Sequence, residues 1–241
     1  METFEGFMAR IGPDPAVTGV VLSGSQAREG TATAHSDHDV YLIVAEGAAH
    51  EPRRDELVDA VIMTLEQFRG HALPGSGTEW NRYAFAYAKV LKDTADGLIA
   101  SLVTAKATLT PGEADVVGRE ALGVFLNSAY RCLKNGRDGN RVGVLLDGAE
   151  TVPSYLAYVF ALHGRVRPYN KYLEWELRHH PLGPALWSAE KLLPRLEAAL
   201  SAEAPAAVRV LLNDLEPYAR AAGHGDVLDS WGEDLAFMRG A

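Results

Sequence analysis

Two aspartates one residue apart, Asp37 and Asp39, lead into an apolar stretch of the chain. Side chains of a β-strand alternate between its two faces, so residues at positions i and i+2 point to the same side. Two carboxylates held side by side repel each other, and a bound cation offsets that cost. Hard oxygen ligands favour Mg²⁺, which completes its coordination shell with water and substrate phosphates. The pair therefore predicts a divalent-metal site.

A Gly-Ser pair, Gly24 and Ser25, supplies the second candidate group, because it ends an apolar run at 17–22 that is typical of a short buried strand. Glycine lets the backbone come close to a ligand, and the Ser25 hydroxyl and nearby backbone N–H groups can donate hydrogen bonds to phosphate oxygens. A helix beginning within 26–29 would help to orient those groups. Arg28 follows the turn directly and is assigned to phosphate binding, with pairing to a carboxylate as the alternative.

Each of these motifs also has an ordinary explanation when it stands alone. Gly24 and Ser25 could simply form a turn, and Asp39 could be solvated. Here the two motifs occur in order, at compact spacing, and each is attached to an apolar strand. The combination favours a phosphate and metal site.

A third aspartate, Asp59, lies in the apolar run 57–64, which is expected to form another strand. On that strand it would share a face with Val61 and Met63. A carboxylate is costly to bury unless it is paired, hydrogen-bonded or bound to a metal. Asp59 is therefore the candidate third carboxylate, and the alternative is a strand-end residue at the rim of the sheet.

The order and spacing of these residues resemble the signature of the nucleotidyltransferase superfamily that includes DNA polymerase β. The resemblance rests on Gly24-Ser25, eleven intervening residues, Asp37-His38-Asp39 and an apolar strand. The segments GSQAR at 24–28 and HSD at 35–37 are more similar to small bacterial members, such as aminoglycoside nucleotidyltransferases, than to the polymerases. In that superfamily the third acidic residue lies on the next strand, which is where Asp59 is expected.

This resemblance implies a Mg²⁺-dependent enzyme that moves a nucleoside monophosphate from ATP or another NTP to a hydroxyl and releases pyrophosphate. Asp37, Asp39 and Asp59 would be its catalytic carboxylates and would hold two Mg²⁺ ions. The expected acceptor is a small hydroxylated molecule such as an aminoglycoside-like antibiotic, which would suit an acidic chain. The alternative is an antitoxin-type, nucleotidyltransferase-like protein that binds or adenylylates a partner protein.

Composition limits the remaining function classes. The chain has 241 residues, of which 47% are hydrophobic and 23% charged, as in an ordinary globular protein. Its 32 acidic and 23 basic residues give a formal charge of −9, which works against nucleic-acid binding. The single cysteine, Cys132, excludes an intrachain disulfide and is expected in the core. Neither a zinc-type Cys/His spacing nor the Gly-Lys-Ser/Thr ending of a P-loop occurs.

No segment approaches the roughly 18 apolar residues of a membrane span, and the N-terminal residues lack an apolar leader region. A cytoplasmic protein without membrane contact is therefore expected. The oligomeric state stays open, with a homodimer as one option.

The elements around these residues predict an α+β protein. An N-terminal nucleotidyltransferase domain, with a small mixed sheet and flanking helices, is expected over 1–109. Its elements are a helix at 4–11, strands at 17–22, 57–64 and 89–93, the last an edge strand, a further strand that carries Asp37 and Asp39 and has its apolar part at 41–44, and a helix at 95–108.

A capping box and a proline at the first helical position, in Thr110-Pro111-Gly112-Glu113, start a second domain over 110–241. This domain is expected to be an all-α bundle, with glycines between its helices. The helices are expected at 111–135, 140–163, 168–179, 184–200, 205–222 and 227–238.

The helical half holds candidates for the general base. Asp147 and Glu150 lie in a mostly apolar helix that Pro153 is expected to kink or restart. Glu150 is preferred, because it is next to this irregularity and because its place resembles where aminoglycoside nucleotidyltransferases keep their base. The alternative is an ordinary solvated acid.

A basic cluster with aromatic neighbours follows, formed by Arg165, Arg167 and Lys171. Such a cluster could hold a triphosphate or stack on a base, and Lys171 is the preferred nucleotide-binding residue. The i, i+3 spacing of Tyr172 and Trp175 is also typical of core packing.

Overall fold

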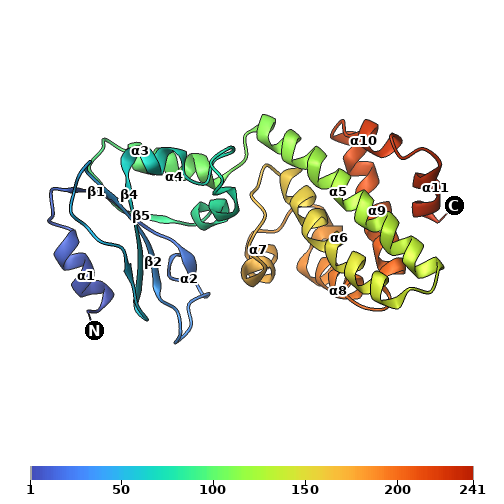
Figure 1. Ribbon diagram of the computed structural model, residues 1–241, viewed down its shortest axis with the longest axis horizontal. Coiled ribbons are helices and arrows are strands. Elements are labelled where there is room, and N and C mark those ends of the chain that lie inside the picture. The colour runs from blue at the N-terminus through green and yellow to red at the C-terminus, as the bar shows by residue number, and fades with distance from the viewer. Residues whose placement is uncertain (1, 241) are drawn as a thin grey trace. The chain divides into compact units, whose positions relative to one another are not determined.

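A computed structural model describes residues 2–240 and has an α+β structure with a small mixed sheet and many helices (Figure 1). The chain divides into two compact units, Met1–Thr108 and Leu109–Ala241. The sheet belongs to the first unit, and the described part of the second contains helices and no β-strand. Within residues 2–240, no helix combines the length and the apolar character that crossing a membrane requires.

The sheet has five strands in the order β3-β4-β2-β1-β5. It is mixed because β2 and β4 run parallel, whereas the other neighbours are antiparallel. Strands β1 and β5 have the bounds expected from the sequence, and β5 lies at an edge. The short strand β3 was not expected, since it lies in a polar stretch without an apolar pattern. The strands are β1 (Val17–Leu22), β2 (His38–Val44), β3 (Arg53–Arg54), β4 (Val58–Thr64) and β5 (Lys89–Asp93).

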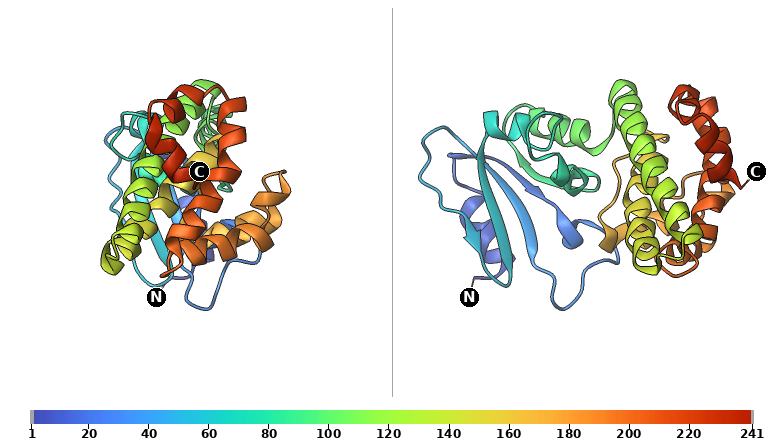
Figure 2. Two further views of the ribbon diagram at one scale, coloured as in Figure 1. Left: turned by 90° about the vertical axis from the view of Figure 1, so that its right-hand side faces the viewer. Right: turned by 45° about the vertical axis from the view of Figure 1, so that its right-hand side comes forward.

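Alternation along the strands gives the sheet two buried faces. On one face Leu42 and its neighbours pack with Phe7 and Ile11 of α1 (Phe4–Ile11). On the other face Tyr41 and Ile43 pack beneath α3 (Leu65–Gly70), the 3₁₀ helix η1 (Glu79–Phe85) and α4 (Leu98–Ala107). Figures 1 and 2 show α1 on one side of the sheet and α3 and α4 on the other. The apolar parts of the strands are thereby covered on both faces.

Two buried cations fasten the helical layer above the second face. Lys106 is fully buried, and its Nζ donates to the carbonyl oxygens of Arg69 (3.0 Å) and His71 (2.8 Å) at the end of α3. Arg82 donates in turn to the carbonyls of Lys106 (3.1 Å) and Thr108 (2.6 Å) at the end of α4. The last carbonyls of a helix have no partner within it, so these side chains cap both helices. Burial, with a smaller effect of Arg82, lowers the pKa of Lys106 to about 8.

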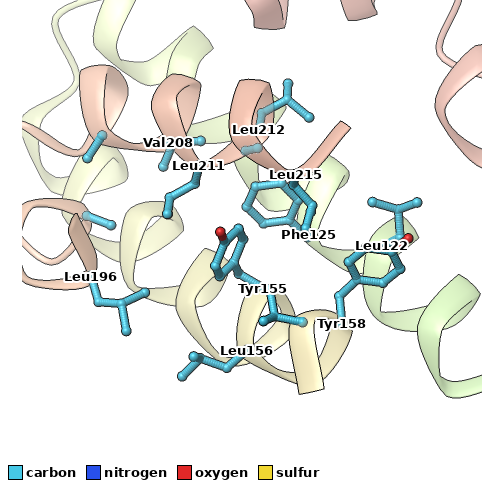
Figure 3. Packing of buried hydrophobic residues seen from close by; sticks show 14 of the residues in the cluster. Leu122, Phe125, Tyr155, Leu156, Tyr158, Leu196, Val208, Leu211, Leu212 and Leu215 are labelled. Carbon is cyan, nitrogen blue, oxygen red and sulfur yellow. The ribbon is translucent and has the colours of Figure 1, made fainter. Parts of the chain in front are cut away.

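The second unit is a bundle around a single large core (Figure 3). Helix α5 begins with the expected capping box, in which Thr110 and Glu113 bond each other's backbone N–H groups. Phe125, Tyr155 and Leu211, from three different helices, meet in the core. The helices are α5 (Pro111–Arg137), α6 (Arg141–Ala161), α7 (Leu173–His179), α8 (Ala189–Ala199), α9 (Ala204–Ala221), α10 (Gly225–Asp229) and α11 (Glu233–Arg239), with 3₁₀ turns η2 (Asn170–Tyr172) and η3 (Ala185–Trp187).

Helix α6 and the single cysteine of the chain both contribute to this core. The helix runs from Arg141 to Ala161 as a single element, in agreement with the one helix expected over 140–163, so Pro153 does not restart it, and the alternative of a kink stays a prediction. The proline is accommodated because the helix loses one backbone bond there but keeps its packing against the core. Cys132 is buried, as expected, and burial raises the pKa of its thiol to about 11.

Candidate metal and phosphate site

The parallel pairing of β2 and β4 places Asp39 directly opposite Asp59. Asp37 comes one residue before β2 begins. One carboxylate oxygen from each of these three aspartates lies within 4.8 Å of the other two, which is a spacing that a metal ion can bridge. The structure thus brings together the three carboxylates that the sequence singled out, two from one strand segment and one from its neighbour.

The residue between the first two aspartates points the other way. The ring of His38 stacks on Phe4 of α1 at 4.0 Å between centroids, and its Nδ1 lies 3.1 Å from the carbonyl oxygen of Leu57. This follows from the alternation of side chains in an extended strand. His38 therefore anchors the beginning of β2 to α1, and the carboxylates of Asp37 and Asp39 are left on the opposite side.

The three aspartates are half-buried. Asp59 also has a cationic neighbour, because Arg54 of β3 is paired with it in the sheet and places Nε 3.6 Å from Asp59 Oδ2. The Arg54 side chain is 88% exposed. An ion pair with so exposed a partner contributes only about 0–1 kcal/mol, so a divalent cation can displace it. Three carboxylate oxygens in a partly exposed position are a ligand set that suits Mg²⁺.

The turn after β1 lies against this cluster. The Ser23 N–H donates to the carbonyl oxygen of Asp39 at 2.8 Å, which continues the β1–β2 pairing into the turn. Gly24 follows with a φ of +65°, a conformation that favours glycine. A Cβ at Gly24 would lie 1.7 Å from Oδ2 of Asp39. Only glycine therefore fits between the turn and the carboxylate.

Residues Gly24–Ala27 form the short helix α2, which begins at the glycine itself and not within 26–29. The chain turns immediately at the end of β1, because the positive φ of Gly24 reverses it there, and by Arg28 the backbone is already extended. Ser25 lies in this turn and is only 3% exposed. The Gly-Ser pair thus forms a tight, well-packed corner next to Asp39.

Arg28 is buried beneath this corner and is 3% exposed. Its guanidinium donates to the carbonyl oxygens of Gly24 at 2.7 Å and Tyr83 at 3.0 Å, and it lies 4.8 Å from the centre of the Tyr83 ring. These contacts fasten the turn to η1. In this conformation Arg28 supports the backbone of Gly24, a role that neither sequence-based alternative described.

Glu150 and Asp147 lie one turn apart on α6, in the second unit. Both pair with Arg131 of α5: Glu150 through a hydrogen-bonded ion pair, and Asp147 at 3.1 Å. Asp147 also accepts a hydrogen bond of 2.6 Å from Asn135. Glu150 is exposed and Asp147 is half-buried. Both acids thus link α5 to α6, and the choice of Glu150 as general base stays a prediction.

The basic residues of the second unit that the sequence grouped together make different contacts in the structure. Arg165 forms an ion pair with the buried carboxylate of Glu176. Lys171 is exposed in η2, with Nζ 5.3 Å from the ring centre of Tyr172. Tyr172 itself is 6% exposed, which agrees with the core-packing alternative for this residue. Nucleotide binding by Lys171 stays a prediction.

Arg54 and Tyr83 are the neighbours of the site that sequence reasoning missed. Arg54 lies on a strand of two residues, which has no periodicity to detect. Tyr83 meets Arg28 across 55 positions of sequence. Neither residue gives a local signal, because Arg54 meets Asp59 only through the pairing of β3 with β4, and Tyr83 meets Arg28 only through the packing of distant segments.

No family model matches the chain, and no curated protein matches it.

Proposed function

We propose that the chain is a Mg²⁺-dependent nucleotidyltransferase that moves a nucleoside monophosphate, AMP from ATP in the first instance, to a hydroxyl of a small molecule. The observation that carries this proposal is that carboxylate oxygens of Asp37, Asp39 and Asp59 lie within 4.8 Å of one another, beside a Gly-Ser corner so close that a Cβ at Gly24 would overlap the Asp39 carboxylate. Nucleotidyl transfer needs ligands for the metal ions, and it needs a backbone turn that can approach the phosphates; both occur here side by side.

In this proposal the three aspartates hold the metal ions, and Gly24 with Ser25 contacts the triphosphate. Bound Mg²⁺ would neutralise part of the phosphate charge and would stabilise the attacking and leaving oxygens. The acceptor hydroxyl oxygen forms a bond to the α-phosphorus, and the bond from that phosphorus to the bridging oxygen breaks, which releases pyrophosphate. The hydroxyl proton passes to a carboxylate, for which Glu150 is the first candidate and Asp147 the second.

The acceptor is proposed to be a small hydroxylated molecule, with an aminoglycoside-like cation as the first class to test. The formal charge of −9 favours cationic small molecules and disfavours nucleic acid. The cytoplasm, where ATP and Mg²⁺ are supplied, is the proposed location. An antitoxin-type binding protein is the less favoured alternative, because a pure binder has no physical reason to keep three like charges together.

The test is transfer of label from [α-³²P]ATP to a panel of aminoglycosides and other hydroxylated acceptors, in Mg²⁺ and in excess EDTA. We expect a labelled acceptor and pyrophosphate only with Mg²⁺. Asp37→Asn and Asp39→Asn should each lower the rate by about a hundredfold or more, because each removes a charged metal ligand. Glu66→Gln, an exposed acid of α3, is the matched control and should keep full activity. Transfer that survives in both aspartate variants would overturn the metal assignment.

A further inference from the structure

A pocket of about 380 Å³ lies within the second unit, between α6, the segment 167–174 and α8. Apolar side chains form most of its wall, among them Val152, Leu156, Leu173 and Leu196. A volume of this size and an apolar lining with few polar groups are typical of sites for small organic molecules. The pocket is independent of the three aspartates, since every residue that lines it belongs to the second unit.

One cation lines the pocket, and the described chain gives it no counter-charge. Arg167 donates through Nη2 to Oδ1 of Asn170 at 2.6 Å, but its Nε is buried and has no hydrogen-bond partner within residues 2–240. Arg167 also forms no ion pair in that part of the chain, unlike Arg165, which is neutralised by Glu176. A buried N–H donor on a charged group is costly to leave unsatisfied. That nitrogen is itself inaccessible, but Arg167 as a residue lines the pocket, so an anion bound to the accessible part of its guanidinium would supply the missing counter-charge.

A proline of α6 also contributes to the lining. Ala149 and Pro153 of α6 both line the pocket. Because proline has no N–H, the helical hydrogen bond that position 153 would make to the Ala149 carbonyl does not form. At this part of the lining the helix therefore has one backbone hydrogen bond fewer.

The remaining polar groups of the pocket limit the charge of its ligand. Glu174 and Glu197 are both exposed and contribute carboxylates to the lining. Glu174 is paired with Arg178 at 3.0 Å, whereas Arg167 is the pocket's cation. Two acids in the lining disfavour a polyanion such as a nucleoside triphosphate. The lining thus combines one cation without an ion pair, two exposed acids and mostly apolar side chains, which limits a bound anion to a single negative charge, placed on Arg167.

We propose that this pocket binds a small apolar monocarboxylate, with its carboxylate on the Arg167 guanidinium and its hydrocarbon part against Leu156 and Leu173. Charged hydrogen bonds to a guanidinium are strong and directional, which makes Arg167 the determinant of specificity. The apolar walls supply the remaining affinity by removing the hydrocarbon from water.

The experiment titrates the full chain with octanoate and 4-phenylbutyrate, and with octan-1-ol and 4-phenylbutan-1-ol as uncharged counterparts, by calorimetry. At least one carboxylate should bind at least about tenfold more tightly than its alcohol, since a hydrogen bond to a charged group is lost in the alcohol. Arg167→Met should weaken carboxylate binding by a similar factor. Arg209→Met is the matched control, because Arg209 also has a buried Nε without a partner in the described chain but lines no part of this pocket. It should bind like the unaltered chain.

Two further measurements keep the test decisive if Arg167→Met fails to fold. Ala149→Phe places a large side chain in the pocket without changing its charge, and it should abolish binding. In the unaltered chain, methyl NMR should show probe-induced shifts concentrated on the leucines of the lining, including Leu156, Leu173 and Leu196. The proposal is overturned if neither carboxylate binds at millimolar concentration, if the alcohols bind equally well, or if the shifted methyl groups lie elsewhere.

Discussion

At the scale of single residues, the candidate metal site depends on the absence of a side chain at Gly24. Its backbone has a φ of +65°, and the position of a Cβ would overlap the Asp39 carboxylate. The glycine therefore permits both the turn and the approach of that turn to a metal ligand. A side chain of any size would force either the turn or the Asp39 carboxylate to shift, which changes the geometry of the three aspartates.

Replacement of Gly24 by alanine should weaken Mg²⁺ binding by about tenfold or more, since one carboxylate ligand is displaced. The left-handed backbone adds a destabilisation of about 1–2 kcal/mol. Gly30→Ala is the matched control, because Gly30 has a φ of +74° but a Cβ added there would meet no atom within 4 Å. It should lose similar stability and keep its Mg²⁺ affinity, as measured by calorimetry and urea unfolding. Equal Mg²⁺ affinity in both variants would refute the proposed steric conflict.

Arg54 permits a second test at this scale, since it competes with a metal for Asp59. Arg54→Ala should raise Mg²⁺ affinity by about two- to fivefold, which corresponds to the loss of a weak exposed ion pair. Arg69→Ala, which removes an exposed arginine of α3 that pairs with Glu66, is the control and should leave the affinity unchanged. The measurement is calorimetric titration at low salt. A lowered affinity in Arg54→Ala would mean that Arg54 supports the site.

At the scale of elements, buried cations take the place of ordinary helix caps in the first unit. Lys106 bonds the carbonyls at the end of α3, and Arg82 bonds those at the end of α4. This arrangement holds α3, η1 and α4 in one layer above the sheet. It places a lysine in a buried position that disfavours its charged form, which makes the stability of the layer sensitive to pH.

Lys106 should make the stability of the protein rise with pH in the alkaline range. Its pKa is lowered from the usual 10.5 to about 8 by burial. Between these two values the unfolded chain binds more protons than the folded chain, so the free energy of unfolding increases with pH; below the lower value both states are protonated and the effect is constant. The unfolding free energy of the unaltered chain should therefore increase, relative to that of Lys106→Met, by about 1–3 kcal/mol from about pH 7 to about pH 10. Urea unfolding at both pH values measures it, and a constant difference would show that Lys106 does not titrate in this way.

At the scale of the whole molecule, the chain forms two units with separate hydrophobic cores. The three aspartates belong to the first unit, and the 380 Å³ pocket belongs to the second. A ligand stabilises the folded state to which it binds. Metal and carboxylate ligands should therefore protect different parts of the chain.

Mg²⁺ should slow amide hydrogen exchange in peptides that cover 17–44 and 58–64. At a free concentration about ten times its Kd, exchange through unfolding of that unit slows by about tenfold. Peptides of α5 and α9 should change little, because the proposed ligands all lie in the first unit. Asp37→Asn provides the control and should show no Mg²⁺-dependent protection. Protection centred on the second unit would contradict the proposed metal site.

The sequence by itself determined the elements whose signals are local. Helix α1 and strands β1 and β5 have the bounds that residue patterns predict, and α5 begins at its predicted capping box. Turn residues, capping residues and apolar periodicity act over a few positions, so they can be read without the fold. The spacing of Asp37 and Asp39 likewise fixes the side of the strand on which both carboxylates lie.

Only the tertiary structure decided which distant residues meet. The parallel pairing of β2 with β4 sets Asp59 opposite Asp39, and a shift of one position would have sent Asp59 to the other face. The inward turn of Arg28 and the burial of Lys106 depend on partners far away in sequence. Strand register and helix packing arise from the sum of many weak contacts across the core, and no single stretch of sequence encodes that sum.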